Sequence, residues 1–406
     1  MRLKNHIHYL FIVFMASAII VSYPSVLFSS PVADEAQKIY QDKAKNVFQI
    51  RVIDNSTGKK SSIGSGFVFS KEGHVATNFH VVAQAVSYPD RYRLDYVKED
   101  KNEGQLVVES FDVVRDIAIL RSSEAFDSFI PMGVSDLPKG AMIFSMGNPH
   151  DLGMTIIDGT YNGLMEQSLY QKILFSGSLN PGMSGGPALN RDGEVIGVNV
   201  ATAGNAVSFV VPVEYLQELH ERLLKDGPLD PALWDDRIEQ QLVLNQEMYI
   251  NDLIGRPWNV LTVGQARVPG EMSKAFRCWG ESKDEKKDLF LVSLAQCSSE
   301  DVLFISSDLY TGQIGYQYEW LKGKDLDMFR YYNLYEARFG SQEVFTNADK
   351  KEATNFQCMI DFIVLNGADW KIAFCTRNYK KYPLLFDVNI NMASVHEESL
   401  GLLPVF

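Results

Sequence analysis

A short glycine-rich stretch, Gly182-Met183-Ser184-Gly185-Gly186-Pro187, constrains the fold and the chemistry of this chain more than any other segment. A glycine backbone can turn sharply and lie close to a bound molecule. Ser184 is therefore a candidate nucleophile. The N–H groups of Gly182 and Ser184 can point into one small space, where they would hold the negative oxygen of a tetrahedral intermediate. The stretch predicts acyl-transfer chemistry.

A nucleophilic serine needs a base, and the base needs a group that orients it. Two upstream residues have the right type and setting. His80 follows a predicted β-hairpin and opens a short helical turn, and Asp116 directly precedes the apolar run Ile117-Ala118-Ile119-Leu120, which is expected to be a buried strand. The chain order of the three candidates is His, Asp, Ser.

This order, together with the spacing and the local motifs, resembles the trypsin-like double-barrel serine proteases, in particular the bacterial HtrA/Deg branch. Further segments that are similar in the same order are residues 143–149, 180–187, 192–198 and 208–212. The resemblance covers residues 36–225 and implies two β-barrels, a triad of His80, Asp116 and Ser184, and an oxyanion hole formed by Gly182 and Ser184.

The same resemblance bears on substrate preference. Trypsin-like enzymes that select Lys or Arg carry an acid six residues before the nucleophile, and here that position is Ser178, with Leu179 beside it. An unpaired cation would lose its solvation in such a pocket. We therefore expect a pocket for small or medium apolar side chains. Alternatively, Leu179 belongs to the core of a barrel.

Metal ions and cofactors are not expected. The other histidines, among them His74 and His220, show no ligand spacing on one face, and they are not interleaved with the cysteines. The net charge of −13 also argues against a nucleic-acid partner, because a phosphate backbone must meet a basic surface. The expected partners are protein or peptide substrates.

The N-terminal segment is typical of export. Arg2 and Lys4 precede an apolar stretch from Tyr9 to about Phe28, so residues 1–33 are interpreted as a signal peptide or, alternatively, an uncleaved membrane anchor. We expect a periplasmic or secreted protein, with a tether to the inner membrane if the segment is retained.

All the cysteines lie in the C-terminal part of the chain, and in an oxidising compartment disulfides are their natural interpretation. Four cysteines allow three connectivities. Similar spacings, each enclosing strand-like residues, favour local bridges from Cys278 to Cys297 and from Cys358 to Cys375. A weak internal duplication would explain the similarity, and chance is the alternative.

The whole chain is expected to be mainly β, with more than one domain. The predicted organisation is the segment 1–33, a trypsin-like protease domain over 34–228, a helical linker over 229–258, and a mainly-β domain over 259–406 with two similar halves as one option. Helices are expected over 34–45, 214–224 and 231–253. The sequence shows no carboxylate-binding loop of a PDZ domain after residue 259, so the C-terminal partner stays unassigned.

Two functions are compatible with these features. The first is an exported serine endopeptidase in protein processing or quality control. The second is a catalytically idle binding or chaperone-like protein on a protease fold. The first is favoured, because an idle scaffold has no physical reason to keep all three side chains.

Overall fold

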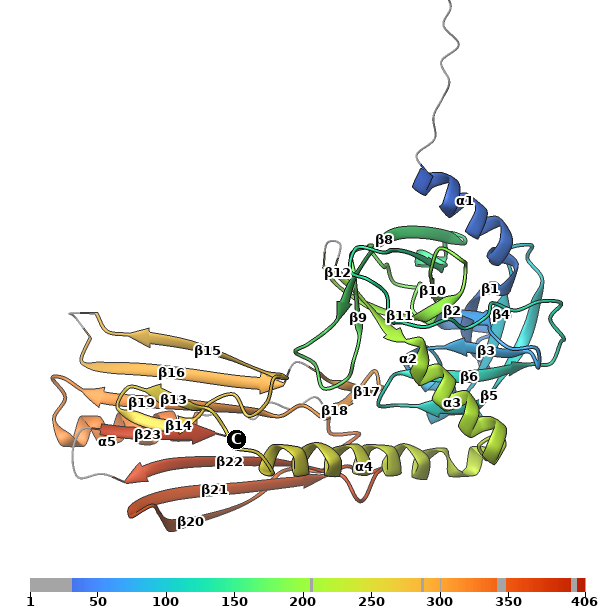
Figure 1. Ribbon diagram of the computed structural model, residues 1–406. Coiled ribbons are helices and arrows are strands. Elements are labelled where there is room, and N and C mark those ends of the chain that lie inside the picture. Colours follow the sequence, from blue (N-terminus) through green and yellow to red (C-terminus); the bar gives the residue numbers. More distant parts are fainter. Residues whose placement is uncertain are drawn as a thin grey trace, which may run out of the picture.

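The computed structural model describes residues 31–204, 207–285, 288–299, 301–341, 348–395 and 400–405. Within these residues the strands form two closed barrels and a separate seven-stranded antiparallel sheet (Figure 1). The expected mainly-β class, with a double barrel followed by a second β domain, is confirmed. Most of the predicted export segment, residues 1–30, lies outside the described residues.

The first barrel contains the predicted base and acid. Its strand order is β1-β2-β3-β6-β5-β4. The β2–β3 hairpin turns at Gly73, whose φ of 82° suits glycine. The strands are β1 (Val47–Asp54), β2 (Lys59–Val68), β3 (His74–Thr77), β4 (Tyr92–Val97), β5 (Glu103–Asp112) and β6 (Ile117–Ser122). Helix α2 (Phe79–Ser87) follows β3 directly and buries its apolar side chains in this barrel's core.

The second barrel contains the predicted nucleophile, and its strand order is β10-β11-β12-β9-β8-β7. The strands are β7 (Met142–Gly147), β8 (Thr155–Leu164), β9 (Ile173–Phe175), β10 (Pro187–Leu189), β11 (Val195–Gly204) and β12 (Val207–Pro212). The glycine-rich stretch is the loop between β9 and β10.

Helices α1 (Pro31–Lys43) and α3 (Val213–Asp226) pack on an apolar cluster to which strands of both barrels contribute. In α3 the buried residues Val213, Leu216, Leu219 and Leu223 recur at helical spacing. The helix ends at Gly227, which has a φ of 78° and donates its N–H to the carbonyl of Leu223. Short 3₁₀ turns cover Ala44–Asn46, Pro149–Asp151 and Pro231–Leu233.

The C-terminal sheet has the strand order β15-β16-β19-β23-β22-β21-β20. Its strands are β15 (Phe276–Lys283), β16 (Phe290–Ser299), β19 (Gly315–Gly323), β20 (Gln357–Leu365), β21 (Ala368–Asn378), β22 (Phe386–Val395) and β23 (Leu400–Val405). Helix α5 (Met328–Gly340) packs against it through Tyr331 and Tyr335.

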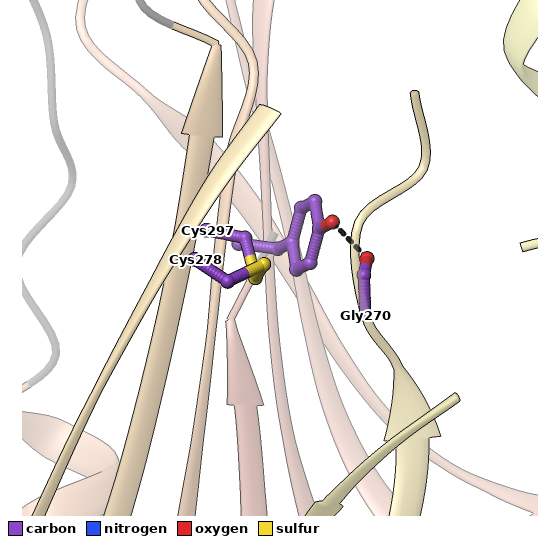
Figure 2. The surroundings of a disulfide bond; sticks show 4 residues. Gly270, Cys278 and Cys297 are labelled. Atoms are coloured by element: carbon purple, nitrogen blue, oxygen red, sulfur yellow. Dashed lines mark hydrogen bonds between the residues drawn. A yellow bond between two sulfur atoms is a disulfide. The ribbon is translucent and has the colours of Figure 1, made fainter. Parts of the chain in front are cut away.

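Both expected disulfides are confirmed. Cys278 bonds to Cys297 across β15 and β16, and Cys358 bonds to Cys375 across β20 and β21, so the bridges lie in the hairpins at the two edges of the sheet. Near the first bridge, the hydroxyl of Tyr316 donates a hydrogen bond to the carbonyl of Gly270 (Figure 2). The internal duplication remains a prediction.

Helix α4 (Trp234–Ile254) joins the barrels to the sheet (Figure 1). Its first half buries Trp234, Ile238 and Leu242 in the first-barrel core, and its second half buries Tyr249 and Leu253 in the core of the C-terminal sheet. Among the described residues, no helix has the length and apolar character that a membrane crossing requires.

Two short hairpins complete the C-terminal part. Strands β13 (Val260–Val263) and β14 (Ala266–Pro269) pack on the sheet, whereas β17 (Leu303–Ser306) and β18 (Leu309–Thr311) leave it and lie against helix α2 of the first barrel (Figure 1). The C-terminal domain is therefore in direct contact with the helix that contains His80.

Candidate functional site

His80 and Asp116 form a close pair at the start of helix α2. The Nδ1 of His80 lies 2.7 Å from Oδ2 of Asp116, and the backbone N–H of His80 donates to Oδ1 of the same carboxylate at 2.8 Å. Asp116 thus fixes both the position of the helix start and the rotation of the imidazole. A carboxylate at a helix N-terminus is also favoured by the helix dipole.

Asp116 adopts an uncommon backbone conformation, with a φ of 57°. Aspartate tolerates positive φ better than most residues, and such conformations cluster at functional sites. The side-chain amide of Asn78 donates to the carbonyl of Asp116 at 2.8 Å. This bond holds the loop before β6 against the segment that carries His80.

The electrostatic setting of His80 suits a base. Burial by itself lowers the pKa of His80, but the negative charge of Asp116 and its hydrogen bond to the ring raise that pKa above the ordinary value. The side chain of His80 is 28% exposed, so a substrate can still reach the imidazole.

The loop that contains Ser184 depends on glycines at points of close backbone contact. Gly182 has a φ of 97°, and a Cβ there would overlap the carbonyl oxygen of Asn148. Gly185 has a φ of 86°, and a Cβ there would overlap backbone and side-chain oxygens of the first barrel. Between them, the side chain of Met183 is fully buried in the second-barrel core and anchors the loop. Only glycine fits these two positions.

Further contacts place Ser184 next to the His80 segment. A Cβ added at Gly64 would lie 2.5 Å from the side chain of Val81 and 3.2 Å from the carbonyl oxygen of Ser184. A Cβ at Gly185 would lie 3.1 Å from the backbone nitrogen of Asn78. The structure thus brings the loop of the predicted nucleophile against the residues that flank the predicted base.

The hydroxyl of Ser184 donates to the carbonyl of Val200, at 2.6 Å. A hydroxyl has a single proton, so in this conformation that proton is directed at β11 and not at His80. Catalytic hydrogen bonds often form only when substrate is bound, so this contact is compatible with a nucleophilic role for Ser184.

Ser65 in β2 is a positioning residue that the sequence reasoning missed. It is fully buried, its N–H donates to the carbonyl of Ser184 at 2.7 Å, and its hydroxyl donates to the carbonyl of Gly182 at 2.7 Å. One residue of the first barrel therefore holds both ends of the Gly182–Ser184 turn. Its placement between Gly64 and Gly66 was the available signal, because paired glycines mark close backbone approach.

The two residues predicted for the specificity pocket have different surroundings. Ser178 is exposed, whereas Leu179 is 5% exposed and belongs to the core cluster of the second barrel. Of the two, only Ser178 is accessible to a substrate in this conformation. Their role in specificity remains a prediction.

A histidine cluster lies elsewhere on the first barrel, although sequence spacing alone did not bring its members together. Potential ligand atoms of Glu72, His74 and His220 lie within 4.8 Å of one another. Nδ1 of His74 lies 2.9 Å from Oγ of Ser70 and 3.0 Å from Nε2 of His220. The guanidinium of Arg121 lies 2.6 Å from Nε2 of His74 and supplies positive charge there. Hydrogen bonds therefore hold His74 against Ser70 and His220 within this cluster.

Comparison with known proteins identifies the part of the chain that carries the site. A family model described as a trypsin-like peptidase domain matches residues 64–198. Protease Do-like 1, chloroplastic, of Arabidopsis thaliana is 30% identical over 240 residues, which are 52% of this chain and 52% of that protein. A probable periplasmic serine endoprotease DegP-like of Marinomonas sp. (strain MWYL1) is 31% identical over 185 residues, 43% of this chain and 38% of that protein.

Among solved structures, the serine endoprotease from Yersinia pestis aligns with a TM-score of 0.42 and 23% identity, over 48% of this chain and 68% of that one. The chain spans about half the length of the curated relatives it matches, or less. The double barrel that holds His80, Asp116 and Ser184 is therefore similar to the protease domains of the HtrA/Deg serine proteases, and most of it matches the trypsin-like peptidase family model.

Proposed function

We propose that this protein is a serine endopeptidase that cleaves protein or peptide substrates through a Ser184–His80–Asp116 triad. The observation that carries the proposal is the doubly hydrogen-bonded His80–Asp116 pair, which lies beside a glycine-lined loop that presents Ser184. This combination of nucleophile, base and orienting acid is the one that acyl transfer requires.

The reaction begins when substrate binding turns the Ser184 hydroxyl from Val200 toward His80. His80 accepts the proton while Ser184 Oγ bonds to the peptide carbonyl carbon, and Asp116 stabilises the imidazolium that forms. The N–H groups of Gly182 and Ser184 stabilise the oxyanion. His80 then gives its proton to the leaving amine, and water activated by His80 hydrolyses the acyl-enzyme.

The relatives suggest a cellular setting. They include proteases whose names place them in the periplasm, which favours a periplasmic or secreted protein that acts in protein processing or quality control. The disulfides at both edges of the C-terminal sheet fit an oxidising compartment.

Replacement of the nucleophile is the decisive test. The purified wild-type chain should react covalently with a fluorophosphonate probe and cleave denatured casein. Ser184→Ala should abolish labelling and lower turnover by roughly a million-fold. Ser123→Ala, which changes an exposed serine of the first barrel, is the matched control and should behave like wild type.

One observation favours the alternative of a catalytically idle binding protein, namely the bond from the Ser184 hydroxyl to the Val200 carbonyl. If wild type resists the probe in the presence of unfolded polypeptide as well as in its absence, the peptidase assignment is wrong. A folded Ser184→Ala protein that cleaves casein at the wild-type rate would contradict it equally.

A further inference from the structure

One short segment of the C-terminal domain contacts both barrels at the edge of the proposed site. Asp301 lies beside the loop between β8 and β9 of the second barrel, and Phe304, three residues later, lies against the imidazole of His80 in the first barrel. The two barrels are therefore linked at this point by residues that the protease domain itself does not supply.

The rings of Phe304 and His80 meet in an edge-to-face arrangement. The ring centroids of Phe304 and His80 are 5.9 Å apart, with an interplanar angle of 73°. Phe304 is paired directly with Tyr310 across the β17–β18 hairpin, and the two rings meet edge to face with centroids 5.3 Å apart. Phe304 and Tyr310 thus form a continuous aromatic wall beside His80.

Buried residues on the opposite face of the β17–β18 hairpin hold the wall in place. Leu303 and Ile305 flank Phe304 in β17, and because side chains alternate along a strand they project to the opposite face. Both are buried, together with Leu309 of β18, in the core that contains helix α2 and the first half of α4. The wall therefore cannot move without opening that core.

Asp301 fixes the other end of the segment. Its buried carboxylate accepts hydrogen bonds from the N–H of Leu169 at 2.6 Å and from the hydroxyl of Ser168 at 2.9 Å. It also pairs with Lys172 at 3.1 Å. Charge-assisted bonds of this kind are stronger than neutral ones. The position of Phe304 is thus set relative to both barrels.

We propose that Phe304 and Tyr310 form one wall of a substrate subsite, which takes an apolar side chain from a substrate residue that flanks the scissile bond. The proposal rests on the peptidase function proposed above. The wall keeps free apolar surface, since Phe304 is only partly buried and Tyr310 is 38% exposed. Burying a substrate side chain against it is favourable because apolar surface leaves water.

The geometry argues for a subsite wall over an inhibitory cover. His80 remains 28% exposed beside Phe304, so the ring borders the imidazole without closing it off. The C-terminal domain would in this way determine which bonds the protease domain cleaves.

The test is the profile of bonds cleaved in a denatured proteome by the full-length chain. Wild type should prefer an apolar residue at one position next to the cleaved bond. Phe304→Ala should lose that preference and lower kcat/KM for a preferred peptide by about tenfold or more, mainly through a higher KM. Phe304→Leu, which keeps an apolar surface, should retain much of the preference.

Two further variants provide an independent test of the subsite and a control. Tyr310→Ala changes the exposed member of the wall, so it tests the same subsite even if Phe304→Ala fails to fold. Phe329→Ala alters an exposed phenylalanine on α5 and should leave the profile unchanged. An unaltered profile in folded Phe304→Ala or in Tyr310→Ala would overturn the proposal. A uniform rise in activity on all peptides would also overturn it, because that result would show that the two aromatic side chains cover the site and inhibit it.

Labelling of Ser184 by the fluorophosphonate probe distinguishes a failure of the subsite from a failure of the peptidase function. If wild type reacts with the fluorophosphonate probe at Ser184 while the aromatic variants keep the wild-type profile, only the subsite is wrong. If wild type neither reacts nor cleaves, the peptidase function fails and the subsite fails with it.

Discussion

The Ser184 hydroxyl and the Val200 carbonyl are hydrogen-bonded at 2.6 Å, so the proposed nucleophile is held by the strand β11 of its own barrel. The proposed base, His80, is already oriented by Asp116. His80 is therefore already positioned by its acid, whereas the Ser184 hydroxyl is directed at β11 and not at His80. Under the proposed mechanism, substrate binding turns the Ser184 hydroxyl toward His80.

Asp116→Asn is expected to lower activity and to change its dependence on pH. His80 must be neutral to accept a proton, so kcat/KM should rise with pH through the pKa of His80, which lies above its ordinary value of 6.5. Asparagine removes the charge that raises this pKa, so the midpoint should move to lower pH, while kcat falls by roughly ten-thousand-fold. Peptide hydrolysis measured between about pH 5 and pH 9 checks both effects. Asp158→Asn, an exposed carboxylate on β8, should leave the midpoint where it is in wild type.

Gly182→Ala is expected to inactivate the protein through the backbone. Its added Cβ would meet the carbonyl oxygen of Asn148, which cannot give way easily, so the turn that aims the Gly182 N–H would be distorted. Loss of one oxyanion donor costs about 100-fold to 1,000-fold in kcat. Gly140→Ala is the matched control, since its φ of 92° is similar but nothing lies within 4 Å of the added Cβ. It should cost roughly 1–2 kcal/mol of stability and keep activity. Equal activity of the two variants would contradict this account.

The pair formed by His74 and His220 is expected to make the fold sensitive to acid. Burial lowers the pKa of both side chains, and the charge of Arg121 lowers them further. Folded-state pKa values below the unfolded value mean that the stabilising effect is present above about pH 6.5 and is lost as pH falls through the lowered values. Thermal denaturation should show a lower Tm at pH 5.5 than at pH 7.5. His220→Gln should reduce that difference, whereas His150→Asn, at an exposed position, should preserve it.

Removal of either disulfide is expected to destabilise the C-terminal sheet by a similar amount. The bonded cysteines are separated by 19 and 17 residues, and closing loops of this size is worth about 3 kcal/mol. Cys358→Ala combined with Cys375→Ala should lower the free energy of unfolding accordingly, and so should the double alanine variant at the other edge. Guanidinium-induced unfolding, monitored by tryptophan fluorescence, measures the change in the free energy of unfolding. Both variants should still react with the fluorophosphonate probe below their unfolding transitions, and a loss smaller than about 1 kcal/mol would show that the bridges do not limit stability.

Local sequence patterns were enough for the parts of the site that lie within single motifs. Ser184 among its glycines, His80 after its hairpin and Asp116 before its strand each have a recognisable setting, because short-range backbone requirements restrict the residue types there. The pairing of Cys278 with Cys297 was predictable for the same reason, since both lie in one hairpin.

Contacts between distant segments were not predictable from these patterns. Nothing in the residues around Phe304 indicates a partner in the first barrel. A short apolar strand of this kind is typical of the core of its own domain. His74 and His220 are far apart in the sequence, and only the packing of α3 on the first barrel brings their rings together. The Ser184 rotamer likewise depends on β11, which the glycine-rich motif does not encode.

The shared packing of helix α4 has a practical consequence. About 32 Å long, the helix contributes apolar side chains to two separate cores, so its removal would bare hydrophobic surface on the barrel as well as on the sheet. A recombinant fragment that stops after α3 is therefore expected to aggregate. The double-barrel half of this polypeptide therefore relies on the half that follows to cover its hydrophobic surface.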